Sequence, residues 1–368
     1  MDPMRVPRPE ELLDRARPPE YSAQARALVA GRRIVVTGAA GSIGSELVRQ
    51  LSRLDPEAVL HVDIDEGRLH ALQLELFGEA FAPGSHVALA DIRDKRGLDV
   101  VLRAFRPQVV FHAAALKHLN LLERFPCEGV RTNVFGTASV VAAARRAGAE
   151  TFVNISTDKA ADPISVLGAT KRLAEVLARP ADASSTRYAS VRFGNVIGSR
   201  GSFYDTLVHQ VCHGLPVTIT HPDVTRFLMT IPEAAGLVIE AAALAQDGEI
   251  FVLDMGRPVR ILDLVERFAR HAGIPVPPVR ITGLMPGEKL HEVLFSRGES
   301  DAPTPVPRVW RSPAPSASPA LPPLLERLRR AVVAGDAART RDLLALAVPS
   351  MNRPVSGQLP GAEMALSA

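Results

Sequence analysis

The sequence predicts an α/β fold in which helices cover both faces of a doubly wound parallel sheet, followed by a smaller α/β domain. Apolar runs of strand length alternate with helix-length segments through the first half of the chain. These runs are continuously apolar, as in parallel strands that are buried on both faces. A glycine-rich turn also joins the first run directly to an amphipathic segment. The expected strands are Arg33–Thr37, Ala58–Asp63, 86–90, 108–112, Thr151–Ile155, 189–193 and, later in the chain, 250–253.

Length and composition suit one large domain and a smaller partner. The chain has 368 residues, of which 46% are hydrophobic and 23% charged, enough for a sizeable core. Its 43 Lys and Arg residues only slightly exceed its 40 Asp and Glu residues, and the charges are dispersed. A nucleic-acid-binding protein would instead concentrate basic residues in one patch. We therefore expect a protein that acts on small molecules and has no nucleic-acid partner.

The sequence also predicts a cytoplasmic protein without a metal site or a membrane span. Cys127 and Cys212 occur in no metal-binding or redox spacing, so we expect reduced thiols in a reducing cytosol. Residues 1–20 are charged and interrupted by proline, unlike a signal peptide. The most apolar later stretch, 234–245, is too short to cross a bilayer and carries Glu240.

Glycine and proline mark the expected domain boundaries. After Asn195 the strand and helix pattern loosens into glycine- and proline-punctuated segments. A Pro/Ser/Ala-rich stretch follows residue 297, and helical periodicity returns near residue 324. We expect an N-terminal arm at 1–31, a cofactor-binding domain at 32–195 plus about 226–255, a substrate-binding domain at about 196–225 plus 256–297, a Pro-rich linker at 298–323, a helical extension at 324–348 and a disordered tail at 349–368.

The glycine-rich turn predicts a dinucleotide site. Gly38, Gly41 and Gly44 follow the first strand, and an amphipathic segment, SELVRQLSRL, comes next. The first glycine allows a tight turn, the second lets the backbone approach a pyrophosphate, and the third lets helix and strand pack closely. With Ser42 and Ile43, this turn would place the pyrophosphate at the N-terminus of the helix.

Residues at the ends of the next strands would complete the site. Asp63 ends the second strand, where an acidic residue binds the adenosine ribose hydroxyls and favours NAD over NADP. Arg68 lies nearby and keeps NADP open as an alternative. The other expected contacts are Asp91 and Ile92 beside the adenine, and Ala113, Ala114 and Ala115 beneath the cofactor.

A set of motifs, in order and without large gaps, resembles one enzyme family over roughly residues 6 to 295. The motifs read TGAAGSIGSEL, VVFHAAALKH, RTNVFGT, STDKAADPISVLGATKRLAE, RFGNVIGSRGS, THPDVTRFLMTIPEA, EIFVLDMG and GLMPGEKL. Together they are similar to the extended short-chain dehydrogenase/reductases that act as nucleotide-sugar 4,6-dehydratases, in particular the CapD-like UDP-N-acetylglucosamine 4,6-dehydratases of polysaccharide biosynthesis. The resemblance implies a Rossmann domain with a smaller C-terminal nucleotide-sugar-binding α/β domain. Relatives carry an N-terminal membrane region, and this sequence begins near the start of their soluble part, which implies a free-standing cytoplasmic form.

The resemblance implies an internal redox cycle on a UDP-sugar. Bound NAD+ removes hydride from C4, and the resulting ketone acidifies the C5 proton. Loss of that proton expels the C6 hydroxyl as water, and the hydride then returns to C6. The product is the UDP-linked 4-keto-6-deoxy-N-acetyl sugar, and the cofactor is regenerated in each turnover.

Two adjacent residues after the fifth expected strand are the candidate acid and base. Elimination needs a base at C5 and an acid at the leaving C6 oxygen, both within hydrogen-bond reach of one sugar ring. The resemblance makes Lys159 the base and Asp158 the acid, so the amine must be partly neutral and the carboxyl partly protonated. We expect burial and a nearby cation, Lys171 or the nicotinamide, to lower the pKa of Lys159, and burial to raise the pKa of Asp158.

Position 167 predicts the stereochemical outcome. Lys171 occupies the family position that binds the nicotinamide ribose and lowers the pKa of a neighbouring acid. One helical turn earlier, relatives have either a tyrosine, which the resemblance associates with inversion at C5, or a methionine, which it associates with retention. Leu167 is close to methionine in size and polarity, so we expect a retaining enzyme. Without a phenol, the C4 hydroxyl proton must go to Thr157, Asp158 or a water linked to Lys171.

The remaining motifs supply the expected substrate contacts. A nucleoside diphosphate asks for bidentate cations, for which Arg200 and Arg226 are the candidates. By resemblance, Asn195 contacts the first sugar phosphate, and Glu288, with Lys289 beside it, holds the uridine ribose. Three further residues are expected at the site: Lys117 and His118 near the sugar, although a lone histidine is as often structural, and Asn133 as a bridge from the backbone to Lys171.

Other activities fit some of the same features. A nucleotide-sugar epimerase shares the fold and the 4-keto chemistry but needs no acid at C6, and a 5,6-dehydratase would stop before hydride return. A non-catalytic dinucleotide-binding regulator fits the missing tyrosine, but it has little need of residues 157–159, Arg226 and the GEK segment together. We also expect a homo-oligomer, with residues 1–31 and the helix at 324–347 as candidate interface elements.

Overall fold

The computed structural model describes residues 5–13, 20–79, 86–179, 185–313 and 318–352. Within these residues a nine-stranded sheet forms the centre of the molecule, and seven neighbouring strands of it are parallel. Strand order reverses on either side of β1 (Arg33–Thr37), and in sheets of this kind ligands bind outside the carboxyl ends of the strands at such a point. In spatial order the parallel strands are β3 (His86–Leu89), β2 (Ala58–Asp63), β1 (Arg33–Thr37), β4 (Val109–His112), β5 (Thr151–Ile155), β6 (Arg187–Arg192) and β11 (Asp247–Leu253).

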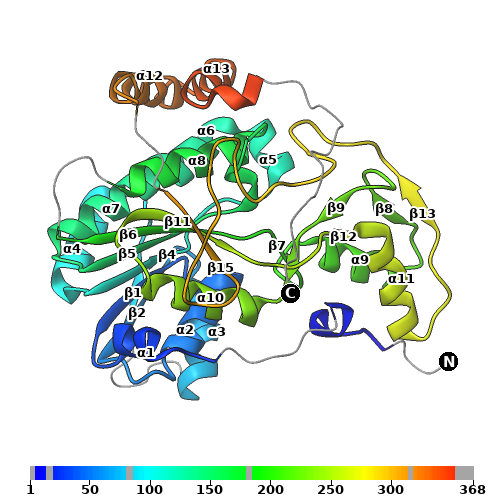
Figure 1. The fold of residues 1–368 in the computed structure, drawn as a ribbon, viewed down its shortest axis with the longest axis horizontal. Coiled ribbons are helices and arrows are strands. Elements are labelled where there is room, and N and C mark those ends of the chain that lie inside the picture. Colours follow the sequence, from blue (N-terminus) through cyan, green and yellow to red (C-terminus); the bar gives the residue numbers. More distant parts are fainter. Residues whose placement is uncertain (1–4, 14–19, 80–85, 180–184, 314–317, 353–368) are drawn as a thin grey trace.

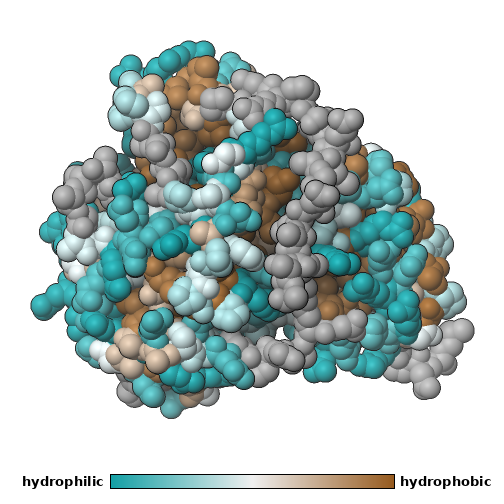
Figure 2. All heavy atoms as spheres, in the orientation of Figure 1, coloured by the Kyte–Doolittle hydropathy of each residue, from teal (hydrophilic) through white to brown (hydrophobic). Residues whose placement is uncertain are grey.

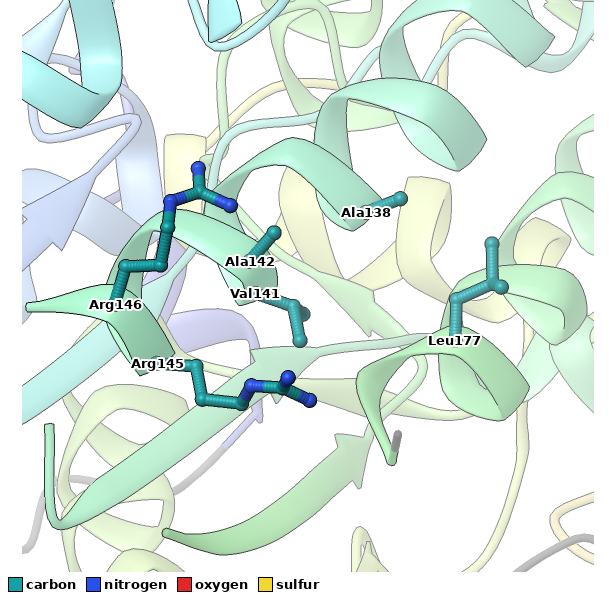
Figure 3. A pocket seen from close by; sticks show the side chains of 6 residues that line it. All are labelled: Ala138, Val141, Ala142, Arg145, Arg146 and Leu177. Atoms are coloured by element: carbon teal, nitrogen blue, oxygen red, sulfur yellow. The ribbon is translucent and has the colours of Figure 1, made fainter. Parts of the chain in front are cut away.

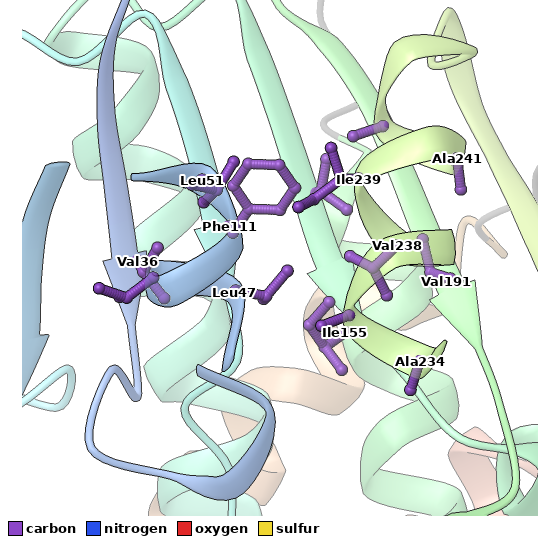
Figure 4. Packing of buried hydrophobic residues seen from close by; sticks show 14 of the residues in the cluster. Val36, Leu47, Leu51, Phe111, Ile155, Val191, Ala234, Val238, Ile239 and Ala241 are labelled. Atoms are coloured by element: carbon purple, nitrogen blue, oxygen red, sulfur yellow. The ribbon is translucent and has the colours of Figure 1, made fainter. Parts of the chain in front are cut away.

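Helices cover both faces of this sheet, so the predicted doubly wound α/β fold is confirmed (Figure 1). Figure 4 shows Leu47, Leu51, Val238 and Ile239 from one helical layer meeting Phe111 of the sheet. The opposite layer buries Leu98, Leu102 and Val140 against the other face. The first layer contains α1 (Ala23–Val29), α2 (Ser42–Leu51) and α10 (Ile231–Ala243), and the second contains α4 (Lys95–Phe105), α7 (Thr137–Arg146) and α8 (Val166–Ala178); α3 (Glu66–Phe77) follows β2.

Most strand predictions hold to within a few residues. Three expected ranges, Arg33–Thr37, Ala58–Asp63 and Thr151–Ile155, are found unchanged, and β3 and β4 are each one residue shorter than expected. β6 begins two residues before the expected 189–193 because Arg187 and Tyr188 pair with β5. β11 begins three residues before the expected 250–253 because its first residues pair with β6 across a register shift.

Two antiparallel strands extend the sheet beyond β11. They are β15 (Val309–Ser312), which pairs with β11, and β14 (Ala302–Pro303), which pairs with β15. Both lie in the range 298–323 that composition predicts to be a linker, and residues 314–317 of that range lie outside the described residues. Proline content alone therefore does not exclude edge strands, where a missing N–H is tolerated.

A smaller lobe follows β6 and lies to the right in Figure 1. Its core packs Leu207, Val217 and Phe268 together with Leu12 of the N-terminal segment, whose 3₁₀ turn (Pro9–Leu13) lies against α11 (Ile261–Ala272). Residues 1–4 and 14–19 of the predicted arm lie outside the described residues. The lobe contains α9 (Phe203–Cys212), α11 (Ile261–Ala272) and the strand pairs β7 (Asn195–Val196) with β10 (Leu228–Met229), β8 (Val217–Ile219) with β13 (Val279–Ile281), and β9 (Thr225–Arg226) with β12 (Val259–Arg260).

The helix predicted at 324–347 is a pair of helices, α12 (Leu321–Val333) and α13 (Ala337–Ala347). Gly335 takes the left-handed conformation with φ +69°, and the Asp336 side chain caps α13, so the chain turns back between them. The pair buries Leu328 and Leu344 in a cluster that includes residues of α8. Of the predicted tail, Pro349–Asn352 forms a 3₁₀ turn, and residues 353–368 lie outside the described residues.

Hydrophobic side chains gather on the surface over α12 and α13, at the top of Figure 2. Val333 of α12 and Leu346 of α13 are 81% and 57% exposed. The homo-oligomer and the interface role of this segment stay predictions.

Among the described residues, no helix has both the length and the apolar character that a membrane crossing requires.

Candidate active site

A cavity of about 340 Å³ lies at the carboxyl ends of β1 to β4, where the sequence predicts the dinucleotide. Its lining shows that the glycine turn, the acidic strand end and the alanine run meet in one place. A concave site with few convergent polar groups is the usual form of a cofactor pocket. The expected residues in the lining are Gly38, Gly41, Asp63, Asp91, Ile92, Ala113, Ala114 and Ala115, and further lining residues include Ile64, Arg93, Leu116, Glu128 and Thr132.

The glycine turn requires the absence of side chains at two of its positions. Gly38 has φ +71°, and a Cβ there would lie 2.5 Å from the backbone nitrogen of Ala114. A Cβ on Gly44 would lie 1.9 Å from the carbonyl oxygen of Gly38. Strand and helix therefore pack as closely as the sequence predicts; Ser42 and Ile43 begin α2, but neither they nor Gly44 are among the residues that line the cavity.

Asp63 is held in a fixed orientation at the rim of this cavity. Its Oδ2 accepts a hydrogen bond from the Ala40 backbone N–H (2.9 Å), and its Oδ1 accepts from the N–H of Ile64 (2.7 Å). Arg68 also lines the cavity, but its guanidinium is paired with Asp65 at 3.1 Å. The oriented carboxylate favours ribose hydroxyls over a 2′-phosphate at this point.

A second hollow of about 350 Å³ lies on the outer surface of α7 and α8. Figure 3 shows its lining, which consists of Ala138, Val141, Ala142, Arg145, Arg146 and Leu177. It shares no lining residue with the cofactor cavity and brings together no acid and base, so we place the chemistry elsewhere. The described residues also contain no group of three or more side chains that could hold a metal ion.

The predicted acid and base lie directly after β5. Thr157 caps the short 3₁₀ turn Asp158–Ala160, and its hydroxyl donates to Asp158 Oδ1 (3.0 Å). Lys159 Nζ donates to the same oxygen (3.1 Å), whereas Asp158 Oδ2 has no hydrogen-bond partner among the described residues. Asp158 is fully buried, and burial raises its pKa, although Lys159 acts against this shift. The expected direction of the Asp158 pKa is thus confirmed, and its role as the acid stays a prediction.

The expected direction of the Lys159 pKa shift is wrong. Burial alone would lower the pKa of Lys159, but the charges of Asp158 and Glu292 outweigh burial and raise it. The ammonium also donates to Asn195 Oδ1 (2.9 Å) and lies 3.8 Å from Glu292 Oε1. The cation that acts on Lys159 is Arg226, not the expected Lys171.

Sequence reasoning missed Glu292. Its side chain is 2% exposed, and Lys289 Nζ lies 3.4 Å from its Oε2 while donating to the carbonyl of Ala161 (2.8 Å). The signal in the sequence was a second acid four residues after Glu288, in EKLHE, which places two carboxylates in one short segment. Only the fold shows that the second of them reaches the Asp158–Lys159 pair.

Lys171 and Leu167 lie on α8, one helical turn apart. Burial lowers the pKa of Lys171 to about 8, although Glu175 opposes the shift, and its Nζ donates to the carbonyl of Ile155 (2.5 Å). Leu167 is 5% exposed and packs in an apolar cluster with Leu122. No proton donor or acceptor is therefore supplied by position 167.

Asn133 does not bridge to Lys171 as expected. It lies on the π-helical turn Val130–Gly136, its side chain bonds both the N–H and the carbonyl of Leu116, and it donates to Thr170 (3.1 Å). Lys171 uses the Ile155 carbonyl instead. Asn133 therefore holds the segment after β4 against α8, close to the cavity. Its partner on α8 is Thr170, the residue before the expected Lys171.

The two arginines expected at the diphosphate have other partners. Arg226 is 7% exposed and donates to the carbonyls of Thr225 and Lys289 and to the carboxylate of Glu288. Arg200 lies against the glycine turn, where its guanidinium donates to the Ala40 carbonyl (2.8 Å). The structure thus places Arg200 on the cofactor side of the site, and direct substrate contact by Arg226 and Glu288 stays a prediction.

Lys117 and His118 lie at the start of α5 (Leu119–Arg124). Lys117 Nζ donates to Ser199 Oγ (3.1 Å), and burial lowers the pKa of this lysine. His118 precedes α5 and closely approaches Gly201, where a Cβ would lie 2.5 Å from the ring. Through these contacts both residues connect the segment after β4 to the loop before α9. Their contact with a sugar stays a prediction.

Comparison with known proteins finds one matching family and several similar proteins and structures. The family described as polysaccharide biosynthesis protein matches residues 34–313. The chain is 43% identical over 288 residues to the probable polysaccharide biosynthesis protein EpsC of Bacillus subtilis, covering 76% of this chain and 48% of that protein. It therefore spans about half the length of this relative.

Relatives of similar length include two kinds of enzyme. An inverting UDP-N-acetylglucosamine 4,6-dehydratase of Campylobacter jejuni is 32% identical, covering 73% of this chain and 79% of the relative. A UDP-glucose 4-epimerase of Rickettsia rickettsii is also 32% identical, with coverage of 72% and 78%. Among solved structures, Pen from Bacillus thuringiensis is 30% identical with a TM-score of 0.72, covering 79% of this chain and 90% of that one.

Proposed function

The chain belongs to the polysaccharide biosynthesis protein family of nucleotide-sugar dehydratases and epimerases, and from this premise we propose that it is a C5-retaining, NAD-dependent UDP-N-acetylglucosamine 4,6-dehydratase. One observation carries the proposal. A fully buried carboxyl and an amine whose side chain is 16% exposed, Asp158 and Lys159, are hydrogen-bonded at 3.1 Å at the carboxyl end of β5, in the sheet whose β1 to β4 form the cofactor cavity. An epimerase has no step that requires an acid and a base together at neighbouring carbons.

The pair can supply both groups by moving one proton. In the resting site Lys159 is an ammonium and Asp158 a carboxylate, held together by their hydrogen bond. Transfer of one proton from Nζ to Oδ1 gives a neutral amine and a carboxylic acid, which are the base for C5 and the acid for the C6 oxygen. Burial of Asp158 favours its neutral form, whereas the charge of Glu292 favours the ammonium form of Lys159.

The residues of the cavity fit a nicotinamide dinucleotide. Gly38, Gly41 and the first turn of α2 would hold the pyrophosphate, and the fixed Asp63 carboxylate would hold the adenosine ribose. When bound, NAD+ supplies the hydride acceptor and donor that C4 oxidation and C6 reduction require. Lys171, buried on α8, would hold the nicotinamide ribose, and Arg200 would lie beside the pyrophosphate.

Leu167 supports the retaining outcome. The side chain is buried among apolar neighbours and can neither take nor give a proton. Asp158 and Lys159 then remain as the acid and base of the elimination, so the same lysine that removes the C5 proton can return it to the same face. Retention follows from one base acting on one face of the ring.

Incubation with UDP-N-acetylglucosamine in deuterated water tests this proposal. We expect a product lighter by one water, deuterium at C5 and no net formation of NADH, because each turnover returns the cofactor to its oxidised form. Mass spectrometry and NMR of the sugar measure all three. Accumulation of NADH contradicts the internal redox cycle.

An epimerase is the second candidate, since a UDP-glucose 4-epimerase is as similar to this chain as a dehydratase is. The same incubation separates the two, because an epimerase leaves the mass of the sugar unchanged. A product that keeps an exocyclic alkene would indicate a 5,6-dehydratase. Binding of NAD without turnover of any UDP-sugar would indicate a regulator.

A further inference from the structure

Lys159 lies between two carboxylates, and only one of them is used in the proposed elimination. Asp158 Oδ1 lies 3.1 Å from Nζ and Glu292 Oε1 lies 3.8 Å from it. Both side chains are almost completely buried, at 0% and 2% exposure. Glu292 comes from a segment that follows β13, so the fold brings it to the site from a distant part of the sequence.

Glu292 is ionised because of the cations around it. Burial alone would raise its pKa, but Lys159, Lys289 and Arg226 together lower it. Asp158 is the other acid that faces the same ammonium. Lys289 is itself fixed by the carbonyl of Ala161, so the position of Glu292 is linked to the chain just after the catalytic pair.

We propose that Glu292 is a positioning residue that holds the Lys159 amine beside Asp158, in reach of the C5 proton. The inference rests on the proposed dehydratase function. When Lys159 takes the C5 proton, the C5–H bond breaks, an N–H bond forms and the amine becomes an ammonium. The electron pair of the C–H bond forms the C5–C6 double bond, the C6–O bond breaks, and the oxygen leaves as water with the proton of Asp158.

The charge that develops in this step appears on the nitrogen that faces Glu292. Glu292 stabilises the ammonium both before and after this step, so its main effect is on where the nitrogen lies relative to the sugar, and placement of a base strongly affects its rate. Glu292 itself neither gains nor loses a proton in the step. It should therefore affect proton removal from C5 and leave C4 oxidation unchanged.

The Glu292→Gln variant tests the proposal step by step. We expect elimination and exchange of the C5 proton with solvent to slow by about 10- to 100-fold, as for a catalytic group that is displaced by about 1 Å. NADH formed transiently in a single turnover should appear at the wild-type rate and then persist. The high-pH limb of the rate profile, which reports loss of the shared proton from Lys159, should move to lower pH, because the lysine loses that proton more easily without the carboxylate.

Two further variants separate this role from a general structural effect. Glu292→Asp keeps a carboxylate and should recover part of the rate, which a loss of folding could not explain. Asp301→Asn removes an exposed acid later in the same part of the chain and should change nothing. Equal slowing of NADH appearance and elimination in Glu292→Gln, or an unmoved pH profile, would overturn the inference. A wild-type protein that forms no dehydrated sugar would instead contradict the proposed function.

Discussion

Replacement of Lys159 by methionine should slow dehydration by about 10²- to 10⁴-fold, the usual contribution of a general acid or base. Methionine keeps the length and apolar stem of the side chain but cannot accept the C5 proton. The nitrogen lies 3.1 Å from Asp158 and 2.9 Å from Asn195, so one substitution removes the base and the group that shares its proton with the acid. Asp158 can remain in the site as a neutral acid, since burial raises its pKa.

The measurement is the rate at which the C5 proton exchanges with deuterated water, together with NAD affinity. We expect NAD affinity to stay within a few-fold of wild type, because Lys159 does not line the cofactor cavity. Lys95→Met, at an exposed lysine at the start of α4, is the matched control and should behave as wild type. A Lys159→Met protein that exchanges the C5 proton at the wild-type rate would assign the base to another group.

Replacement of Arg192 by methionine should lower the free energy of unfolding by about 3–5 kcal/mol, the cost of breaking a buried ion pair. Arg192 is fully buried at the end of β6. Its guanidinium is 2.6 Å from Glu175 and 2.7 Å from Glu299, and Glu175 also accepts a hydrogen bond from Ser156. Methionine would leave two acids without their main cation in a site with little access to water.

Denaturant unfolding measures this loss, and the exposed pair Arg179–Asp247 provides the control. Arg179→Met should cost less than about 1 kcal/mol, because exposed ion pairs contribute little. Similar losses in the two variants would show that the buried network adds nothing beyond a surface pair.

The same network should respond to acid. Burial alone would raise the pKa of Glu299, but hydrogen bonds and charges from Arg192 and its neighbours lower it to about 2. The unfolded value for glutamate is about 4.3, so the stability that Glu299 supplies is complete above that pH and is lost as pH falls toward 2. Unfolding of wild type should therefore become easier through that window, and the Arg192→Met protein should show a smaller change.

The sequence predicts the parts of the molecule that depend on local pattern. Continuous apolar runs identify the parallel strands, and Gly38 and Gly44 are needed because backbone atoms of Ala114 and Gly38 come too close for a side chain. The adjacent pair Asp158 and Lys159 is visible because both residues follow one strand. The break at Gly335 was missed, since an apolar repeat continues on both sides of it.

What the sequence could not predict depends on contacts between distant segments. Glu292 reaches Lys159 only through the packing of the segment after β13, and its charge adds to that of Asp158 in raising the lysine pKa, against the expected direction. Arg200 was expected at the substrate, and its contact with the Ala40 carbonyl depends on how the loop before α9 folds back on the glycine turn. The charge balance of a buried site depends on the distances between side chains that lie far apart in the sequence. These distances cannot be read from the order of the residues.

Transfer of a label from C4 to C6 tests the proposed internal redox cycle most directly. The protein is incubated in ordinary water with UDP-N-acetylglucosamine that carries deuterium at C4, and the product is examined by deuterium NMR and mass spectrometry. The proposed mechanism predicts a dehydrated sugar with the deuterium at C6. Deuterium that stays at C4, or is found in reduced cofactor or in solvent, would contradict it.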